Sequence, residues 1–212
     1  MKRVKSYNIF DRIQEKLKNY IVWEDKVEKL ELIGSSDVSY KEDIAQVCVC
    51  VMKFDDLKIK EKIILKRKVR FPYKAGYLMF REGPLILEAI EKLKTLPDCF
   101  IFDGNGVLHP KNLGLATFLG IILEIPTIGC AKTLFLGKYK TPSEKRGSFS
   151  YIRYKGKILG MALRTQNNVK EVFISCGWGI TLEKAKDIVL KISKFRIPEP
   201  LRIAHLYSKF YD

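Results

Sequence analysis

The first residue whose position suggests chemistry is Asp103, because it directly follows a continuous apolar run, Cys99–Phe102. An apolar run without alternation is typical of a strand that is covered on both faces, as in a parallel α/β sheet. Ligands of such sheets bind beyond the carboxyl ends of the strands, which is where Asp103 would stand. Gly104-Asn105-Gly106 then lets the backbone turn sharply, and on its own this segment is more often a simple turn without a catalytic role.

Two further carboxylates are candidates for the same site. Asp37 lies in the first predicted strand, and Glu82 precedes the Gly83-Pro84 pair at the predicted start of a helix. Carboxylates that share a small space repel one another, and Mg²⁺ relieves this repulsion because it prefers oxygen ligands. Taken singly, Asp37 is equally typical of a solvated turn and Glu82 of a helix start stabilised by the dipole. All three carboxylates together on a strongly basic chain favour a metal site.

Basic residues that could act on a phosphate lie at similar positions. Lys132 follows the apolar segment Ile128–Ala131, so its ammonium group could offset charge at the end of another strand. The chain has 2 histidines, His109 soon after Asp103 and His205 near the C-terminus, where a helix can fold back on the site. Taken singly, such residues are more often a solvated lysine and structural histidines.

An aromatic loop is the next candidate. Phe71–Tyr77 contains Tyr73 between Pro72 and Gly76, which predicts a defined loop with a ring near its tip. Such a ring can insert into a base stack. An equally good interpretation is a tyrosine that covers the edge of the core.

The charge of the chain favours a polyanionic partner. Among its 212 residues, 39 Lys and Arg stand against 24 Asp and Glu, a formal net charge of +15. This excess favours nucleic acid first and an anionic membrane surface second, and it disfavours an enzyme of small anionic metabolites. Many lysines fall on predicted solvent faces of helices, so a generally lysine-rich composition is the alternative. With 47% hydrophobic residues, the chain can form a sizeable core, and we expect one domain over residues 1–212.

The cysteines and the apolar runs indicate a cellular location. The 5 cysteines lie in or beside apolar runs, which predicts buried thiols in a reducing compartment. Cys48-Val49-Cys50 lacks the spacing of a zinc knuckle, so we expect no structural zinc. No apolar run reaches signal-peptide length near the N-terminus or the roughly 20 residues of a membrane span. We expect a soluble, cytoplasmic protein without a membrane partner, and a monomer.

The elements that would position these residues follow from hydrophobic periodicity. Strands are predicted over residues 30–40, 44–54, 59–69, 99–102, 126–131, 151–154, 158–163 and 169–176, and helices over residues 9–21, 83–96, 112–124 and 182–195 and from residue 198 onward. Gly34 indicates a bulge in the first strand, Pro84 lies in the first turn of its helix, and Thr181 caps the helix that follows it.

The order of these elements predicts an α/β fold with a mixed central sheet flanked by helices. Three strands in an antiparallel meander are followed by helix, strand, helix and strand. This plan resembles that of ribonuclease-H-like proteins, in which the first and fourth strands place carboxylates side by side at the centre of the sheet. In that plan Asp37 and Asp103 reach one site.

Motifs along most of the chain, from about Leu30 to Tyr207, resemble those of the endonuclease V family. They occur in the family's order and with similar spacing, and they are Asp37-Val38-Ser39-Tyr40, Pro72-Tyr73 with Gly76, Phe80-Arg81-Glu82-Gly83-Pro84, Asp103-Gly104-Asn105-Gly106, His109-Pro110, Gly114-Leu115-Ala116, Pro126-Thr127-Ile128-Gly129, Ala131-Lys132, Leu163-Arg164-Thr165, and Pro198-Glu199-Pro200 with Arg202, Ala204 and His205.

The resemblance implies a ribonuclease-H-like nuclease of DNA repair that requires Mg²⁺ or Mn²⁺. The implied reaction is hydrolysis of the second phosphodiester bond 3′ to a deaminated purine such as deoxyinosine, leaving a 3′-hydroxyl and a 5′-phosphate. The implied metal ligands are Asp37 and Asp103, with Glu82 as a further carboxylate. Tyr73 matches the family's wedge tyrosine, and Lys132 and His205 match its accessory basic residues. The implied substrate contacts are Pro72, Tyr73, Gly76, Gly83, Gly104, His109 and Gly129.

The chain departs from the family pattern at three places. Lys74-Ala75 replaces an aliphatic residue and proline in the wedge loop, Asn105 replaces Gln or His, and Cys176-Gly177-Trp178 replaces Pro-Gly-His. Two alternatives stay open at this point. One is a nuclease that prefers inosine in RNA, because 2′-hydroxyl contacts cannot be read from a sequence. The other is a binding module without activity, which the acidic residues disfavour because a pure binder gains nothing from carboxylates that face phosphate.

Overall fold

The computed structural model describes residues 8–210, and a mixed sheet of 8 strands runs through it. The strands lie in the order β3-β2-β1-β4-β5-β8-β7-β6. Their bounds are β1 Leu32–Lys41, β2 Ile44–Lys53, β3 Ile59–Lys68, β4 Cys99–Asp103, β5 Thr127–Ala131, β6 Phe149–Tyr154, β7 Lys157–Leu163 and β8 Val172–Trp178. The central pairs β1–β4 and β4–β5 are parallel and the other pairs are antiparallel, which confirms the predicted fold class.

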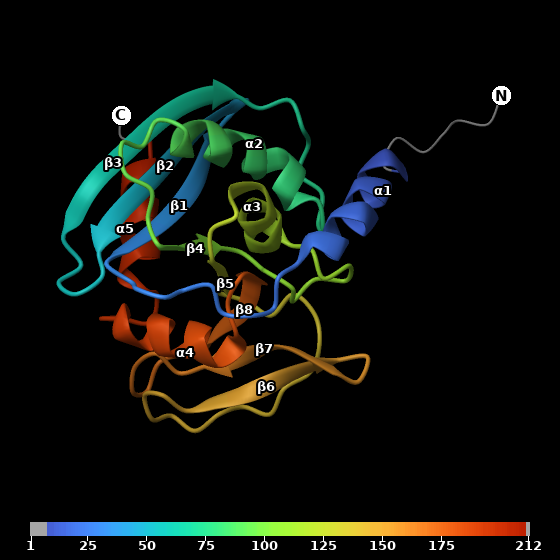
Figure 1. The fold of residues 1–212 in the computed structure, drawn as a ribbon, viewed down its shortest axis with the longest axis vertical. Coiled ribbons are helices and arrows are strands. Elements are labelled where there is room, and N and C mark those ends of the chain that lie inside the picture. Colours follow the sequence, from blue (N-terminus) through green and yellow to red (C-terminus); the bar gives the residue numbers. More distant parts are fainter. Residues whose placement is uncertain (1–7, 211–212) are drawn as a thin grey trace.

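Helices cover both faces of this sheet (Figure 1). They are α1 Asn8–Leu17, continued by a 3-10 turn at Lys18–Tyr20, α2 Leu78–Ile90, α3 Leu115–Leu123, α4 Leu182–Lys191 and α5 Glu199–Ser208. One face packs against α2 and α3, and the other packs against α4 and α5. None of the helices between residues 8 and 210 combines the length and the apolarity needed to cross a membrane.

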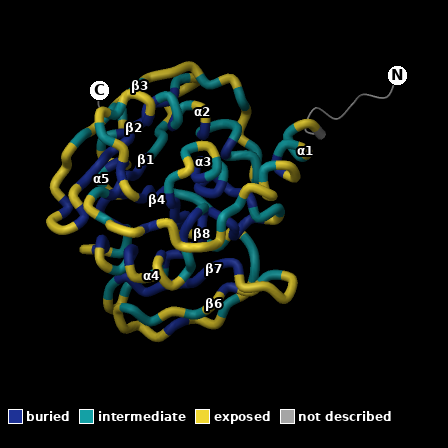
Figure 2. The backbone as a smooth tube through the Cα atoms, in the orientation of Figure 1, coloured by how far each residue is buried: buried dark blue, intermediate teal, exposed yellow. Residues whose placement is uncertain are grey.

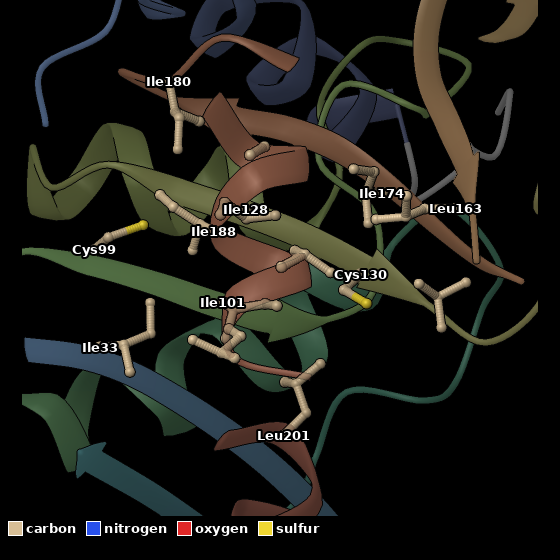
Figure 3. Packing of buried hydrophobic residues seen from close by; sticks show 14 of the residues in the cluster. Ile33, Cys99, Ile101, Ile128, Cys130, Leu163, Ile174, Ile180, Ile188 and Leu201 are labelled. Carbon is tan, nitrogen blue, oxygen red and sulfur yellow. The ribbon is translucent and has the colours of Figure 1, made fainter. Parts of the chain in front are cut away.

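β4 shows why the central strands carry unbroken apolar runs. Phe100 and Phe102 pack with the residues of α2 and α3, whereas Cys99 and Ile101 pack with those of α4 and α5. Figure 3 shows Cys99 and Ile101 near Ile188 of α4, and Figure 2 shows the centre of the sheet as the most deeply buried part of the backbone. Since both faces of β4 are covered, neither face needs polar residues, and the first polar side chain along the strand is that of Asp103 at its end.

The structure corrects the predicted start of the second helix. α2 begins at Leu78 and not at Gly83, so Pro84 lies inside the helix and Glu82 stands in its second turn. Burial explains the earlier start, because Met79 is 1% exposed and belongs to the core formed with α3. Pro84 removes one backbone hydrogen bond but lies on the exposed side of the helix, where its ring is tolerated.

Other elements also differ from their predictions, and α2 itself ends at Ile90, six residues before its predicted end. Gly34 marks no bulge, because the β1–β2 register is continuous there; a Cβ atom on Gly34 would lie 2.3 Å from the Phe100 ring. α3 begins at Leu115 and not at residue 112, since Asn112 has a left-handed φ of 54° that ends helical geometry. α4 ends at Lys191, four residues before the predicted end, whereas its cap is confirmed, with Thr181 Oγ1 accepting from the Lys184 amide.

The five cysteines are buried free thiols, as predicted. Burial raises the pKa of Cys50 to about 11, and the other four pKa values are also raised mainly by burial. These thiols therefore belong to the core and carry no thiolate near neutral pH.

Candidate active site

The parallel pairing of β1 and β4 brings two acidic residues together. The ladder pairs Ser36 with Phe102, and each of these residues directly precedes an aspartate, Asp37 or Asp103. Asp37 points to the face covered by α5, where it meets residues of that helix. Two residues far apart in the sequence thus become neighbours on adjacent strands at the centre of the sheet, as the strand plan predicted.

Glu82 of α2 completes a group of three carboxylates around one cavity of about 210 Å³. The cavity is lined by Ser36, Asp37, Val38, Leu78, Glu82, Ile86, Asp103 and Leu115. Burial, assisted by the charges of Asp37 and Asp103, raises the pKa of Glu82 to about 7. The Tyr40 hydroxyl donates to Glu82 Oε1 at 3.0 Å and partly offsets this effect. A partly buried carboxyl whose pKa is raised by desolvation and by acidic neighbours is a common feature of functional sites.

Basic and hydroxyl side chains contact the two aspartates. The Lys132 ammonium, at the end of β5, forms an ion pair with Asp103 Oδ2. Burial alone would lower the pKa of Lys132, but the charge and hydrogen bond of Asp103 outweigh it and the net change is upward. On the other side of the site, His205 Nδ1 lies 3.1 Å from Asp37 Oδ2, and Ser208 Oγ donates to the same oxygen. The structure therefore brings Asp37, Glu82, Asp103, Lys132 and His205 to one place.

The donor set fits a hard divalent cation held by few protein ligands. Within residues 8–210 no three acidic, histidine or cysteine side chains are arranged closely enough to enclose an ion. Mg²⁺ does not require such a cage, because it keeps several waters and binds through one or two carboxylates with substrate phosphates. Asp37 and Asp103 are two such carboxylates beside a cavity that also has Glu82 on its wall.

A second, smaller cavity of about 130 Å³ adjoins the first, and we call it the glycine-lined pocket. It is lined by Tyr73, Lys74, Ala75, Gly76, Leu78, Met79, Gly104, Asn105, His109, Leu113, Gly114, Leu115 and Phe135. Leu78 and Leu115 belong to the walls of both cavities, and Gly104 of the pocket directly follows Asp103 of the carboxylate cavity. The two sites are therefore built from consecutive residues and share a wall.

His109 forms part of the pocket wall as a neutral ring. Its Nδ1 accepts from the Lys111 amide at 3.3 Å, so the proton resides on Nε2, which donates to the Gly76 carbonyl at 3.2 Å. Burial lowers the pKa of His109 to about 4, against the opposing effect of the Gly76 bond. The ring also stacks on Phe135, with centroids 5.8 Å apart. Near neutral pH this histidine offers an uncharged aromatic edge to a ligand.

The remaining predicted residues divide into exposed and packing positions. Pro72 and Tyr73 are exposed, and 73% of Tyr73 is accessible at the tip of its loop. Gly83 and Gly129 line neither cavity: a Cβ atom at Gly83 would lie 2.6 Å from the Phe118 ring, and one at Gly129 would lie 2.3 Å from the Gly106 nitrogen. Both glycines thus allow close packing, and their contact with substrate stays a prediction.

The roles of two further residues of the site were not predicted from the sequence. Tyr40 stands three residues after Asp37 and holds Glu82, while Ser208 stands three residues after His205 and holds Asp37. Ser208 Oγ also lies 2.8 Å from Ser39 Oγ. The spacing from His205 to Ser208 places both on one side of a helix, and this was the available signal for Ser208.

The part of the chain that forms both cavities matches a known protein family. A family model described as endonuclease V matches residues 15–206, which include every residue of the two cavities. The chain belongs to the endonuclease V family. Endonuclease V of Dictyoglomus turgidum is 48% identical over 199 residues, covering 93% of this chain and 87% of the relative. The chain is thus a nuclease of the hydrolase class, and a module without activity is no longer a candidate.

Solved endonuclease V structures share the fold. The Bacillus subtilis protein has a TM-score of 0.91 and 34% identity, with 97% of this chain and 92% of that chain covered. The Ciona intestinalis protein has a TM-score of 0.85 and 27% identity, with 96% of each chain covered. It was crystallised with a 24-mer DNA that contains an inosine followed by a ribo-adenosine.

Proposed function

We propose that this endonuclease V recognises deaminated purines, above all deoxyinosine, and hydrolyses the second phosphodiester bond on their 3′ side. The products would be a 3′-hydroxyl and a 5′-phosphate. The observation that carries the proposal is the shared wall of Leu78 and Leu115 between the glycine-lined pocket and the carboxylate cavity. An extruded base in the pocket would place its own backbone beside the carboxylates, because Asp103 and Gly104 are consecutive. The inosine-containing DNA bound by the Ciona relative supports this choice of base.

The pocket has the properties that an extruded purine requires. Glycine backbone at Gly76, Gly104 and Gly114 permits close approach of a flat ring, and Leu113 and Leu115 supply apolar contact. The exposed ring of Tyr73 at the pocket rim would fill the gap that the base leaves in the stack.

The carboxylate cavity would hold Mg²⁺, with Mn²⁺ as a substitute, through Asp37 and Asp103, and Glu82 would be the further carboxylate. When bound, such an ion activates water and stabilises the charge that develops on the transferred phosphate. Lys132 would direct its ammonium charge at a phosphate oxygen, because Asp103 holds it in place. His205 and Ser208 would orient Asp37, and Tyr40 would orient Glu82.

A second candidate substrate is inosine in RNA. The DNA of the Ciona complex carries a ribonucleotide next to its inosine, so a 2′-hydroxyl at that position is accommodated in a relative with 27% identity. The 2′-hydroxyl is the group by which a protein distinguishes RNA from DNA.

One experiment tests both substrates. Matched DNA and RNA oligonucleotides, each with a single inosine, are incubated with Mg²⁺, with Mn²⁺ and with EDTA, and the ends of the products are mapped. We expect cleavage at the bond directly 3′ of the nucleotide that follows inosine, which is the second phosphodiester bond, and none in EDTA. Undiminished cleavage in EDTA would disprove the metal requirement, and cleavage at undamaged positions at equal rate would disprove inosine recognition.

A further inference from the structure

The loop that carries Tyr73 is held by a helix far away in the sequence. We call Phe71–Tyr77 the recognition loop. Gln14 of α1 is buried, with 1% of its surface exposed, and its Nε2 donates to the Gly76 carbonyl at 2.9 Å. The same nitrogen lies 3.4 Å from Met79 Sδ in the first turn of α2. A buried amide that points at a loop carbonyl fixes the orientation of that peptide group.

Asp11, one turn earlier in α1, holds the next residue of the loop. The Tyr77 hydroxyl donates to Asp11 Oδ1 at 2.5 Å, and the Lys111 ammonium forms an ion pair with the same oxygen. The hydrogen bond of Lys111, followed by that of Tyr77, lowers the pKa of Asp11. The carboxylate therefore joins the end of the recognition loop to the segment that follows His109.

Phe10 holds the other end of the loop. Its ring lies edge-on against Phe71 at 5.1 Å between centroids and packs on Phe80 at 4.7 Å. Helix α1 thus contacts both the first and the last residues of the recognition loop, while Tyr73 between them projects with 73% of its surface exposed. Figure 1 shows α1 outside the body of the sheet, alongside the start of α2.

The Gly76 carbonyl links this helix to the glycine-lined pocket. It accepts from Gln14 of α1 and from Nε2 of His109 in the pocket wall. Gly76 has a φ of 83°, a left-handed conformation that favours glycine. Because glycine has no Cβ atom, its own side chain does not restrict the backbone conformation of this turn. Two donors, one from the helix and one from the pocket, determine where its carbonyl points.

We propose that α1 is the element that sets the geometry of lesion recognition, with Gln14 and Asp11 as positioning residues for the recognition loop. The inference rests on the proposed function of Tyr73 and of the pocket. Lys74 and Ala75 in the middle of the loop include no proline that would fix a backbone φ, so the contacts from α1 supply a constraint that this segment lacks. The family model begins at residue 15, and both positioning residues lie outside the matched part.

The test compares two variants that lose the same chemical group. Gln14→Met keeps side-chain volume but removes the donor to Gly76. Gln166→Met is the matched control, because Gln166 Nε2 donates to the Ser193 carbonyl at 2.8 Å, in contact with the end of α4 and not with the loop. For each protein we would measure amide hydrogen exchange over residues 71–77 and over β4, and single-turnover cleavage of inosine-containing and undamaged duplexes.

For Gln14→Met we expect faster exchange in residues 71–77 with unchanged exchange in β4. We also expect about a fivefold lower preference for inosine, which corresponds to the roughly 1 kcal/mol of one hydrogen bond. The cleavage rate at saturating enzyme should stay within about twofold of wild type. Gln166→Met should leave loop exchange and preference unchanged. Tyr77→Phe keeps the ring and removes the hydroxyl that donates to Asp11. It should shift both readouts in the direction of Gln14→Met, and it takes the place of that variant if Gln14→Met does not fold.

The outcomes separate this inference from the function on which it rests. If the wild-type protein does not prefer inosine, the proposed function is wrong. Amide hydrogen exchange over residues 71–77 would still show whether contacts from α1 stabilise the recognition loop. If wild type prefers inosine while Gln14→Met and Tyr77→Phe keep both the preference and slow loop exchange, the inference is overturned. Equal losses on both duplexes, with faster exchange in β4 as well, would also overturn it, because α1 would then only stabilise the fold.

Discussion

Asp37 and Asp103 each follow one member of the Ser36–Phe102 pair, the last pair of the parallel β1–β4 ladder. Their partners differ, because His205 and Ser208 contact Asp37 whereas Lys132 contacts Asp103. The pair therefore combines two acidic groups with cationic and hydroxyl partners on either side. This is a suitable arrangement for a bound cation next to a phosphate.

Replacing Asp103 by Asn should abolish most cleavage and leave binding of inosine-containing duplex largely intact. The amide keeps the shape of the side chain but loses the charge that a cation and Lys132 require. We expect a loss of about 100-fold or more, since even the residues that orient metal ligands contribute about 10–100-fold. Single-turnover rates over a range of Mg²⁺ concentrations measure this effect, and a wild-type rate at saturating Mg²⁺ would rule out the role as a ligand.

Replacing Tyr73 by Ala should weaken discrimination of inosine more than general affinity for DNA. The Tyr73 side chain is 73% exposed in the protein alone, so its removal should change the stability of the fold little. Its stacking on DNA contributes roughly 1–3 kcal/mol per base, and only when the lesion has left the stack. Binding and cleavage are compared on inosine and undamaged duplexes, with Tyr73→Phe as the control. A Phe variant as poor as the Ala variant would instead assign the effect to the hydroxyl.

Binding to undamaged duplex should be weak and should fall steeply with salt. The net charge of +15 acts on phosphates and releases counterions without reading the base sequence. The logarithm of the association constant should decrease linearly with the logarithm of salt concentration, as measured by titrations in a series of KCl concentrations. The slopes of wild type and Tyr73→Ala should agree, because the ring carries no charge. A flat response would contradict an interface dominated by phosphate contacts.

Protonation of His109 should destabilise the folded protein. Burial lowers its pKa from about 6.5 to about 4 in the fold, so the unfolded chain binds the proton more readily. The contribution of the neutral ring to the free energy of unfolding is complete above pH 6.5 and is lost as the pH falls toward 4. The lost free energy of unfolding approaches about 3 kcal/mol, because a tenfold change in proton affinity corresponds to about 1.4 kcal/mol.

Urea unfolding of wild type and His109→Gln at several pH values isolates this effect. Both proteins share every acidic group, so the difference between their free energies of unfolding removes the titration of the carboxylates. We expect that difference to shift against wild type by about 3 kcal/mol between pH 7 and pH 4. A difference that stays constant with pH would show that His109 has the same pKa in the folded and the unfolded protein, which would contradict the prediction.

The sequence alone determined the sheet and the identity of the reactive groups. The unbroken run Cys99–Phe102 predicted a strand covered on both faces, and the order of the elements placed Asp37 of the first strand beside Asp103 at the end of the fourth. These inferences hold because strand periodicity and chain connectivity are local properties. The motifs around Glu82, Lys132 and His205 identified the family for the same reason, since each motif is contiguous.

Only the tertiary structure decided where α2 begins and what holds the site together. Gly83-Pro84 carries a strong local signal for a helix start, but burial of Met79 against α3 extends the helix back to Leu78. The contact of Gln14 with Gly76 joins residues separated by 62 positions, and no periodicity in either segment predicts it. A single hydrogen bond of this kind depends on the packing of α1 against the start of α2, and packing is a property of the folded chain as a whole.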